Sequence, residues 1–211
     1  MTSLSTLLTL TDSRLPTGGH VHSGGVEEAV TSGIVVDLAT LRAYLSRRIR
    51  TAGLVTASLA AAVHAGTLTM SDADRETDAR TPAPAARQAS RAQGRGLARL
   101  ARRVWPDDDW RPLGTTPHLA VAAGAVGDAG GLNPDQTALS VVYTTMTGAA
   151  TAAQRLLALD PADVAALTFE LSPLCEATAA EACKELADLS DPLLDVLAQR
   201  HSQRERPLFV S

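Results

Sequence analysis

The chain has 211 residues, 45% of them hydrophobic and 20% charged, a composition typical of one globular domain rather than of a disordered or fibrous chain. Aromatic residues make up only 3%, so the core must consist mainly of Ala, Leu and Val, as in closely packed helices. The net charge of −4 gives no basic field that would attract nucleic acid or an anionic membrane, and we expect neither as a partner.

No segment has the features of a membrane span or a secretory leader. The apolar run at residues 4–10 is short and lacks a basic flank, and nothing approaches the roughly 20 apolar residues of a membrane span. We therefore expect a cytoplasmic protein. Cys175 and Cys183 are eight residues apart in a predicted helix, about 12 Å along its axis, which is too far for a disulfide. Two reduced thiols are expected.

Helical periodicity runs through most of the chain and predicts an all-α fold, with roughly eight to ten helices in a single domain over residues 1–211. Asp37, Asn133 and Asp191 are expected to cap three of these helices. In chain order, the expected helices cover residues 2–11, 24–33, 38–66, 85–104, 118–131, 133–159, 162–171, 174–188 and 192–201.

Several segments allow a second interpretation. Gly53 can divide the helix at 38–66, and residues 71–88 form either a connection or a short helix followed by a loop. Pro173 is expected to interrupt the helix that begins at residue 162. The apolar start of 118–131 is compatible with a buried strand, but its glycines have the spacing of one helix face, which favours a helix.

The segment 16-PTGGHVHSGGVEEAV-30 has the composition of a metal-binding loop. His20 and His22 could share a divalent ion, with Glu27 or Glu28 adding an oxygen ligand. A lasting site usually needs three or four protein ligands, however, and the other histidines are scattered. We therefore favour a glycine-shaped turn that begins a helix, and keep His20 and His22 as weak metal candidates.

Arg155 and a row of arginines on the predicted helix 85–104 both suggest a functional interpretation. Arg155 lies on the polar side of helix 133–159, among small residues, where it either bonds within the fold or faces carboxylates of a partner. The row of arginines on helix 85–104 could pair with acidic side chains of a partner or with phosphates, although a solvated helix face is the commoner outcome. Its members follow one another largely at four-residue steps: Arg87, Arg91, Arg95, Arg99, Arg102 and Arg103.

Sequence motifs of catalysis are missing from this chain. There is no G-x-x-x-x-G-K-[ST] phosphate loop, no G-x-G-x-x-G after a strand, and no H-E-x-x-H, C-x-x-C or G-x-S-x-G. We therefore expect a protein that is not an enzyme and that has no cofactor. The tail 207-PLFVS-211 is apolar after a charged segment, so it either docks on a partner or packs on its own fold.

Taken together, the motifs resemble those of the UreF family of urease accessory proteins over nearly the whole chain. The segment 12-DSRLPTGGHVHSGGVEEAV-30 is similar to the family's amino-terminal motif, in which paired glycines lead to a Ser-x-Gly-x-Glu helix start. The family's Ser-Arg-x-x-Gly, His-x-x-x-x-x-Gly and Arg-Leu motifs are matched by 90-SRAQGRGLARLA-101, 117-PHLAVAAG-124 and 148-GAATAAQRLLALDP-161. The ring positions of the first motif, often aromatic in the family, are His20 and His22 here.

The resemblance implies an all-helical, commonly dimeric adaptor without catalytic chemistry of its own. Such a protein binds UreD or UreH and recruits the GTPase UreG, in the assembly that inserts nickel into apo-urease. It also implies an influence on the GTPase and a carboxy-terminal docking tail, here residues 203–211. The alternative is a nickel carrier that uses His20 and His22. The residues expected to contact partners are Ser23, Gly24, Glu27, Gln154, Arg155, Leu208 and Phe209.

Overall fold

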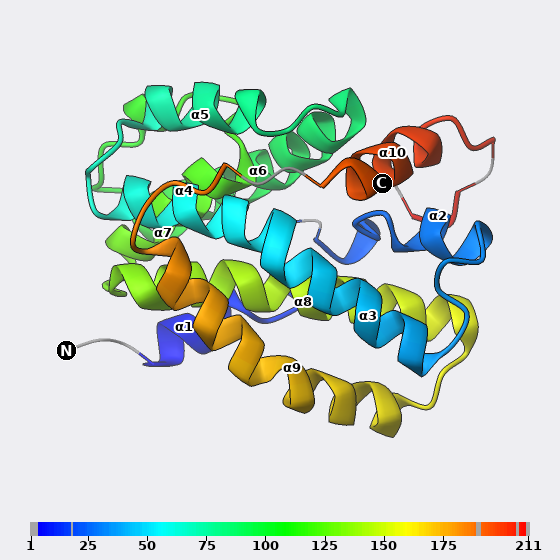
Figure 1. Ribbon diagram of the computed structural model, residues 1–211. Helices are drawn as coiled ribbons and strands as arrows, with labels where there is room; N and C mark the ends of the chain where they lie inside the picture. The colour runs from blue at the N-terminus through cyan, green and yellow to red at the C-terminus, as the bar shows by residue number, and fades with distance from the viewer. Residues whose placement is uncertain (1–3, 18, 189–190, 206, 210–211) are drawn as a thin grey trace.

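The computed structural model describes residues 4–17, 19–188, 191–205 and 207–209, and every regular element within these ranges is helical (Figure 1). The predicted all-α fold is confirmed. The α-helices are α1 (Leu4–Leu10), α2 (Val26–Thr31), α3 (Leu38–Arg48), α4 (Leu54–His64), α5 (Met70–Ala79), α6 (Pro84–Val104), α7 (Leu119–Ala129), α8 (Pro134–Leu157), α9 (Pro161–Ala182) and α10 (Pro192–His201).

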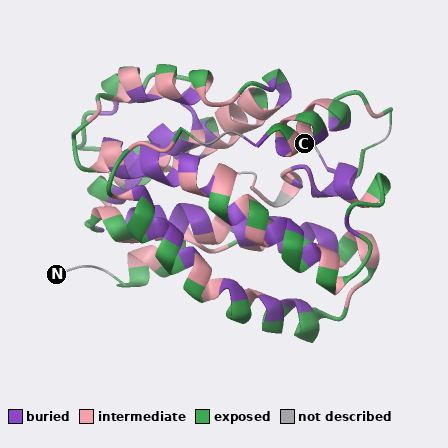
Figure 2. Ribbon diagram, viewed as in Figure 1, coloured by how far each residue is buried: buried purple, intermediate pink, exposed green. Residues whose placement is uncertain are grey.

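Helices α4, α7 and α8 form the centre of the molecule. Helix α8 packs between α4 and α9, and α7 packs between α4 and α6. The larger apolar core joins α2, α3, α4, α8, α9 and α10, and the smaller one joins α5, α6 and α7 with the loop around Trp110. In Figure 1, α9 lies along the lower edge of the molecule and α5 along the upper edge, while α2 and α10 close one end. Buried residues therefore concentrate in the middle layer (Figure 2).

The helix starts follow from local capping chemistry. The side chain of Asp37 accepts the backbone N–H of Thr40, and that of Asn133 accepts the N–H of Gln136 just before Pro134. Asp191 caps α10 in the same way, through the N–H of Leu193. The three predicted caps are thus confirmed, and each satisfies a backbone donor that the first helical turn leaves free.

Two glycine positions explain how closely the helices approach. A Cβ at Gly94 of α6 would lie 2.1 Å from the Pro117 carbonyl oxygen, and one at Gly124 of α7 would lie 2.5 Å from the Ala60 carbonyl oxygen. Glycine is therefore required at both crossings. The segment 118–131 is a helix as favoured, and the strand interpretation is excluded.

One prediction about a helix boundary is wrong, and two alternatives that the sequence left open are decided. Helix α9 runs without a break through Pro173, because proline removes one hydrogen bond while the buried side of the helix stays packed. A π-helical turn, Ile49–Gly53, divides the segment 38–66 into α3 and α4, as Gly53 had suggested. Helix α5, Met70–Ala79, confirms the short-helix alternative for the segment 71–88.

Candidate functional site

The turn before α2 is built by two glycines in the left-handed region. Gly24 has φ +62° and Gly25 has φ +87°, conformations that side chains rarely adopt. A Cβ at Gly24 would also lie 2.5 Å from an Arg48 nitrogen. The Gly24 carbonyl accepts hydrogen bonds from Arg48 Nη1 at 2.7 Å and from the Tyr44 hydroxyl at 3.0 Å. The end of α3 therefore fixes the entry to α2.

Ser23 and Glu27 lie inside the protein and are 0% and 2% exposed. Ser23 Oγ accepts the backbone N–H of Glu27 at 3.4 Å, which joins the turn to the first turn of α2. The Glu27 carboxylate then points toward the carboxy-terminal segment, where His201 Nε2 donates to Oε2 at 2.8 Å. This bond requires the imidazole proton to be on Nε2. His201 is 1% exposed, so the pair is shielded from water.

The same carboxylate holds the chain's last described residues. The backbone N–H of Leu208 donates to Glu27 Oε1 at 2.8 Å, and that of Phe209 donates to Oε2 at 3.0 Å. Phe209 packs into the larger core, whereas Leu208 is 80% exposed. Burial raises the pKa of Glu27, but the hydrogen bonds from Leu208, His201 and Phe209 outweigh it, so the pKa lies below its ordinary value. We call this arrangement of Ser23, Gly24, Glu27, His201 and residues 207–209 the tail anchor.

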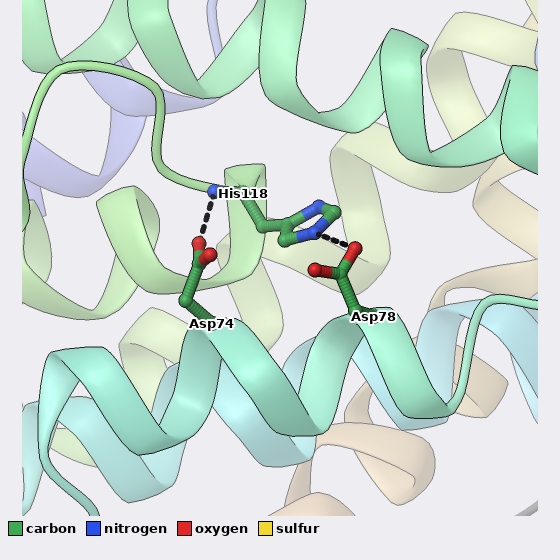
Figure 3. Close-up of side chains that lie close together, drawn as sticks. All are labelled: Asp74, Asp78 and His118. Carbon is green, nitrogen blue, oxygen red and sulfur yellow. Dashed lines mark hydrogen bonds and ion pairs between the residues drawn. The ribbon is translucent and has the colours of Figure 1, made fainter.

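A second cluster of ionisable groups connects α5, α6 and the start of α7 (Figure 3). His118 is 0% exposed; its Nε2 lies 2.9 Å from an Asp78 oxygen and its Nδ1 lies 3.0 Å from Ser90 Oγ. Asp74 accepts the backbone N–H of His118 at 3.0 Å. Arg91 bridges the two carboxylates, at 2.9 Å from Asp74 and 2.7 Å from Asp78. The Ser-Arg-x-x-Gly and His-x-x-x-x-x-Gly motifs therefore meet in space.

Asp74, Asp78 and His118 are close enough to share a metal ion, because one ligand atom of each lies within 4.8 Å of the others. Their contacts favour a structural role instead. The guanidinium of Arg91 already supplies the positive charge between the carboxylates, and both ring nitrogens of His118 are hydrogen-bonded. Burial lowers the pKa of His118 in spite of the Asp78 hydrogen bond. The cluster is best explained as an internal tie between helices.

The predicted site residues divide into two places. Ser23, Gly24, Glu27, Leu208 and Phe209, which are far apart in sequence, come together in the tail anchor. Gln154 and Arg155 lie near the end of α8; Arg155 is exposed and Gln154 is half-buried. Among the described residues, the Arg155 side chain has no ion pair, which leaves it available at the surface. The prediction that these residues contact a partner stays a prediction.

The weak metal candidates gain no support. The side chain of His20 lies outside the described part of the structure, and His22 is half-buried next to Ser23. His22 does not belong to the group of potential ligands found among the described residues. The nickel-carrier alternative stays a prediction.

The arginines of α6 have mixed roles. Arg87 lies 3.8 Å from Asp78, and Arg91 pairs with Asp74 and Asp78, so the first two are used within the fold. Arg95, Arg99 and Arg103 are exposed. The expected solvated face is therefore found in the second half of the helix only.

Sequence reasoning missed three contributors to the tail anchor: His201, Arg48 and Tyr44. Glu27 and His201 are separated by 174 positions, so no local spacing could show that they meet. For Arg48 the only available signal was the pair of glycines, which implied that some side chain approaches this turn closely. Tyr44 lies within the predicted helix 38–66, but nothing in its local sequence indicates that its hydroxyl donates to the Gly24 carbonyl.

The protein is all-helical, and its two clusters of ionisable groups, the tail anchor and the cluster around His118, hold its own helices and tail together. No helix in the described ranges is long and apolar enough to cross a membrane.

The chain belongs to the UreF family, whose model matches residues 35–172. It is 81% identical over its whole length to the urease accessory protein UreF of Mycolicibacterium vanbaalenii, and the alignment covers all of that protein. It is 79% identical to the protein of that name from Mycobacterium sp. strain JLS and 71% identical to that from Mycobacterium bovis, again over both full lengths. The family suggested by the sequence motifs is therefore confirmed.

Proposed function

We propose that this protein is a non-enzymatic, cytoplasmic adaptor of urease maturation. It joins a UreD- or UreH-type accessory protein and the GTPase UreG in the complex that inserts nickel into apo-urease, and it acts as a homodimer. A contact with the GTPase would also give it a means to modulate GTP hydrolysis. The observation that carries the proposal is the full-length similarity to proteins named urease accessory protein UreF.

The tail anchor gives this proposal a physical basis. Two backbone hydrogen bonds to Glu27 hold the tail, and a third from the His201 side chain holds the carboxylate itself, while Phe209 is buried and the neighbouring Leu208 is exposed. An exposed leucine on a fixed backbone loses little conformational entropy when a partner covers it. We infer that Leu208 belongs to the surface that meets the UreD- or UreH-type protein.

Co-expression with the UreD-type and UreG-type proteins of the same organism tests this function. Size-exclusion chromatography with light scattering would compare the intact chain, a chain ending at Arg206, and the variant Leu208→Asp. We expect a stable complex with the intact chain only. Val36→Asp is the matched control, because Val36 is also an exposed aliphatic residue, at 56%, but lies outside the tail. If the intact chain forms no complex, the adaptor function is wrong.

A further inference from the structure

Helix α9 exposes an aromatic side chain on an apolar surface. Phe169, one of only two phenylalanines in the chain, is 80% exposed, while Leu167, Leu171 and Cys175 on the opposite side are buried in the larger core. In Figure 2 the outward side of this helix is lined with exposed residues along the lower edge of the molecule. We call this side the α9 outer face. At 100° per residue its exposed members are Ala162, Ala165, Ala166, Phe169, Pro173, Glu176, Ala177 and Ala180, and the exposed acidic residues Asp163, Glu170 and Glu181 border it on one side.

An exposed helix side is normally polar, which gives the helix an apolar stripe only toward the core. The α9 outer face instead carries one large apolar side chain, a proline, several alanines and a single charge, Glu176. The residues from 162 to 180 span about 27 Å of helix. An apolar surface of this form is typical of a protein–protein contact, in which aromatic residues are enriched and side chains smaller than leucine allow another helix to approach.

The charges of α9 indicate what kind of surface would cover it. The helix contains four acidic residues, Asp163, Glu170, Glu176 and Glu181, and no Lys, Arg or His. The chain has 23 acidic and 19 basic residues, so the rest of the protein carries 19 of each, and α9 accounts for the whole net charge of −4. Glu170 and Glu181 are paired with Arg42 and Lys184, whereas Asp163 and Glu176 are exposed without an ion pair among the described residues.

The α9 outer face offers an apolar side chain and a carboxylate to a partner. A complementary surface must provide an apolar groove together with Lys or Arg donors. A second copy packing through its own α9 contains no basic residue there, and would bury Glu176 without a cation.

We propose that the α9 outer face is the docking surface for a protein partner that covers Phe169 with an apolar groove and faces Glu176 with a basic side chain. This inference rests on the adaptor function proposed above and places that partner among the UreD-type and UreG-type proteins. The surface is distinct from the tail anchor, since Phe169 belongs to α9 and Leu208 follows α10.

The test measures the affinity of the purified full-length chain for each of the two partner proteins, alone and together, at 0.1 and 0.5 M salt. Phe169→Asp should weaken association with one of them at least tenfold. Glu176→Lys should weaken the same association at least fivefold and reduce its dependence on salt. The matched controls are Val104→Asp, which places the same charge at another exposed apolar residue, at 51%, and Glu185→Lys, which makes the same charge change outside α9. Both controls should stay within twofold of the wild type.

The outcomes distinguish a failure of the α9 inference from a failure of the adaptor function. Because Phe169 and Glu176 are exposed, the free variants should keep the wild-type circular dichroism and melting temperature. If the wild type assembles and Phe169→Asp assembles equally well, the α9 inference is wrong and the adaptor function stands. If the wild type does not assemble at all, both are wrong. If light scattering shows that Phe169→Asp turns a wild-type dimer into a monomer, the face is occupied by a second copy and the proposed partner is excluded.

Discussion

Glu27 and Glu28 are adjacent in sequence but have very different surroundings. Glu27 accepts hydrogen bonds from His201 and from the backbone of Leu208 and Phe209, and is 2% exposed. Glu28, 9% exposed, instead accepts hydrogen bonds from Arg204 and Ser32 and makes none with the described part of the tail backbone. The Ser-x-Gly-x-Glu motif therefore includes a glutamate that holds another part of the chain, which explains the acidic residue at this position better than a metal ligand does.

Replacing Glu27 with Ala should lower the free energy of unfolding by about 3 kcal/mol, because it leaves the buried donors of His201 and Phe209 and the part-buried N–H of Leu208 without their acceptor. The amide hydrogens of Leu208 and Phe209 should also lose their protection from exchange. Urea unfolding and hydrogen–deuterium exchange measure the two effects. Glu28→Ala is the comparison, for which we expect a smaller loss and no change in the exchange of Leu208 and Phe209, because it removes the contacts with Arg204 and Ser32 but leaves the tail backbone held by Glu27. Equal effects of the two substitutions would show that the anchor at Glu27 has no special importance.

At the scale of the element, the glycines in the helices differ in what surrounds them. Gly94 of α6 faces the Pro117 backbone, whereas Gly148 of α8 has no atom within 4 Å of the position a Cβ would take. Glycine costs about 1 kcal/mol relative to alanine inside a helix. At Gly94 no larger residue fits, so the fold has to bear this cost. At Gly148 there is room for a Cβ, so alanine could replace glycine.

The two glycines therefore predict opposite signs for the same substitution. Gly94→Ala should destabilise the protein by about 2 kcal/mol or more, since the new methyl group would displace the chain between α6 and α7. Gly148→Ala should stabilise it by about 0.5 to 1 kcal/mol. Thermal and urea unfolding of the two variants provide the comparison. A stabilising Gly94→Ala would contradict the close approach of α6 to Pro117.

Helix positions were predictable from the sequence because apolar periodicity and caps are local. The helix predicted over 133–159 is observed at Pro134–Leu157, and its start was predicted from the cap Asn133, a signal that acts within a few residues. The prediction failed at Pro173, where a local signal for a helix break is overridden by packing of Leu171 and Cys175 against the core. It also could not show that Glu27 meets His201 or that Arg91 meets Asp74, because contacts between distant segments leave no spacing pattern.

For the whole molecule, several ionisable groups make stability depend on pH in the same direction. Hydrogen bonding from Arg47 lowers the pKa of Asp191, and hydrogen bonds from His118 and Arg91 lower that of Asp78 in spite of burial. The pKa of Glu27 is likewise lowered. Burial lowers the pKa of His118 below its ordinary 6.5. In each case the unfolded chain takes up a proton at a higher pH than the folded protein does, so acidification favours unfolding.

We therefore expect the free energy of unfolding to begin to fall below about pH 6.5, where His118 of the unfolded chain becomes protonated. The fall should steepen below about pH 4.5 as the carboxylates follow. Urea unfolding between pH 4 and 8 measures this profile. His118→Gln should reduce the fall in the free energy of unfolding between about pH 6.5 and 4.5, and leave the steep fall below about pH 4.5 unchanged. A protein that becomes more stable between pH 6.5 and 5 would contradict these assignments.

The π-helical turn at Ile49–Gly53 fixes how far α4 is rotated about its axis relative to α3. Such a turn holds one residue more than an α-helical turn, and one residue corresponds to about 100° of rotation around the helix axis. If one residue of this turn were lost, either α3 or α4 would have to rotate by that amount. Arg48 and Tyr44 could then no longer reach the Gly24 carbonyl while α4 kept its contacts with α7 and α8. The fold therefore depends on the number of residues in the turn Ile49–Gly53, and not only on which residues they are.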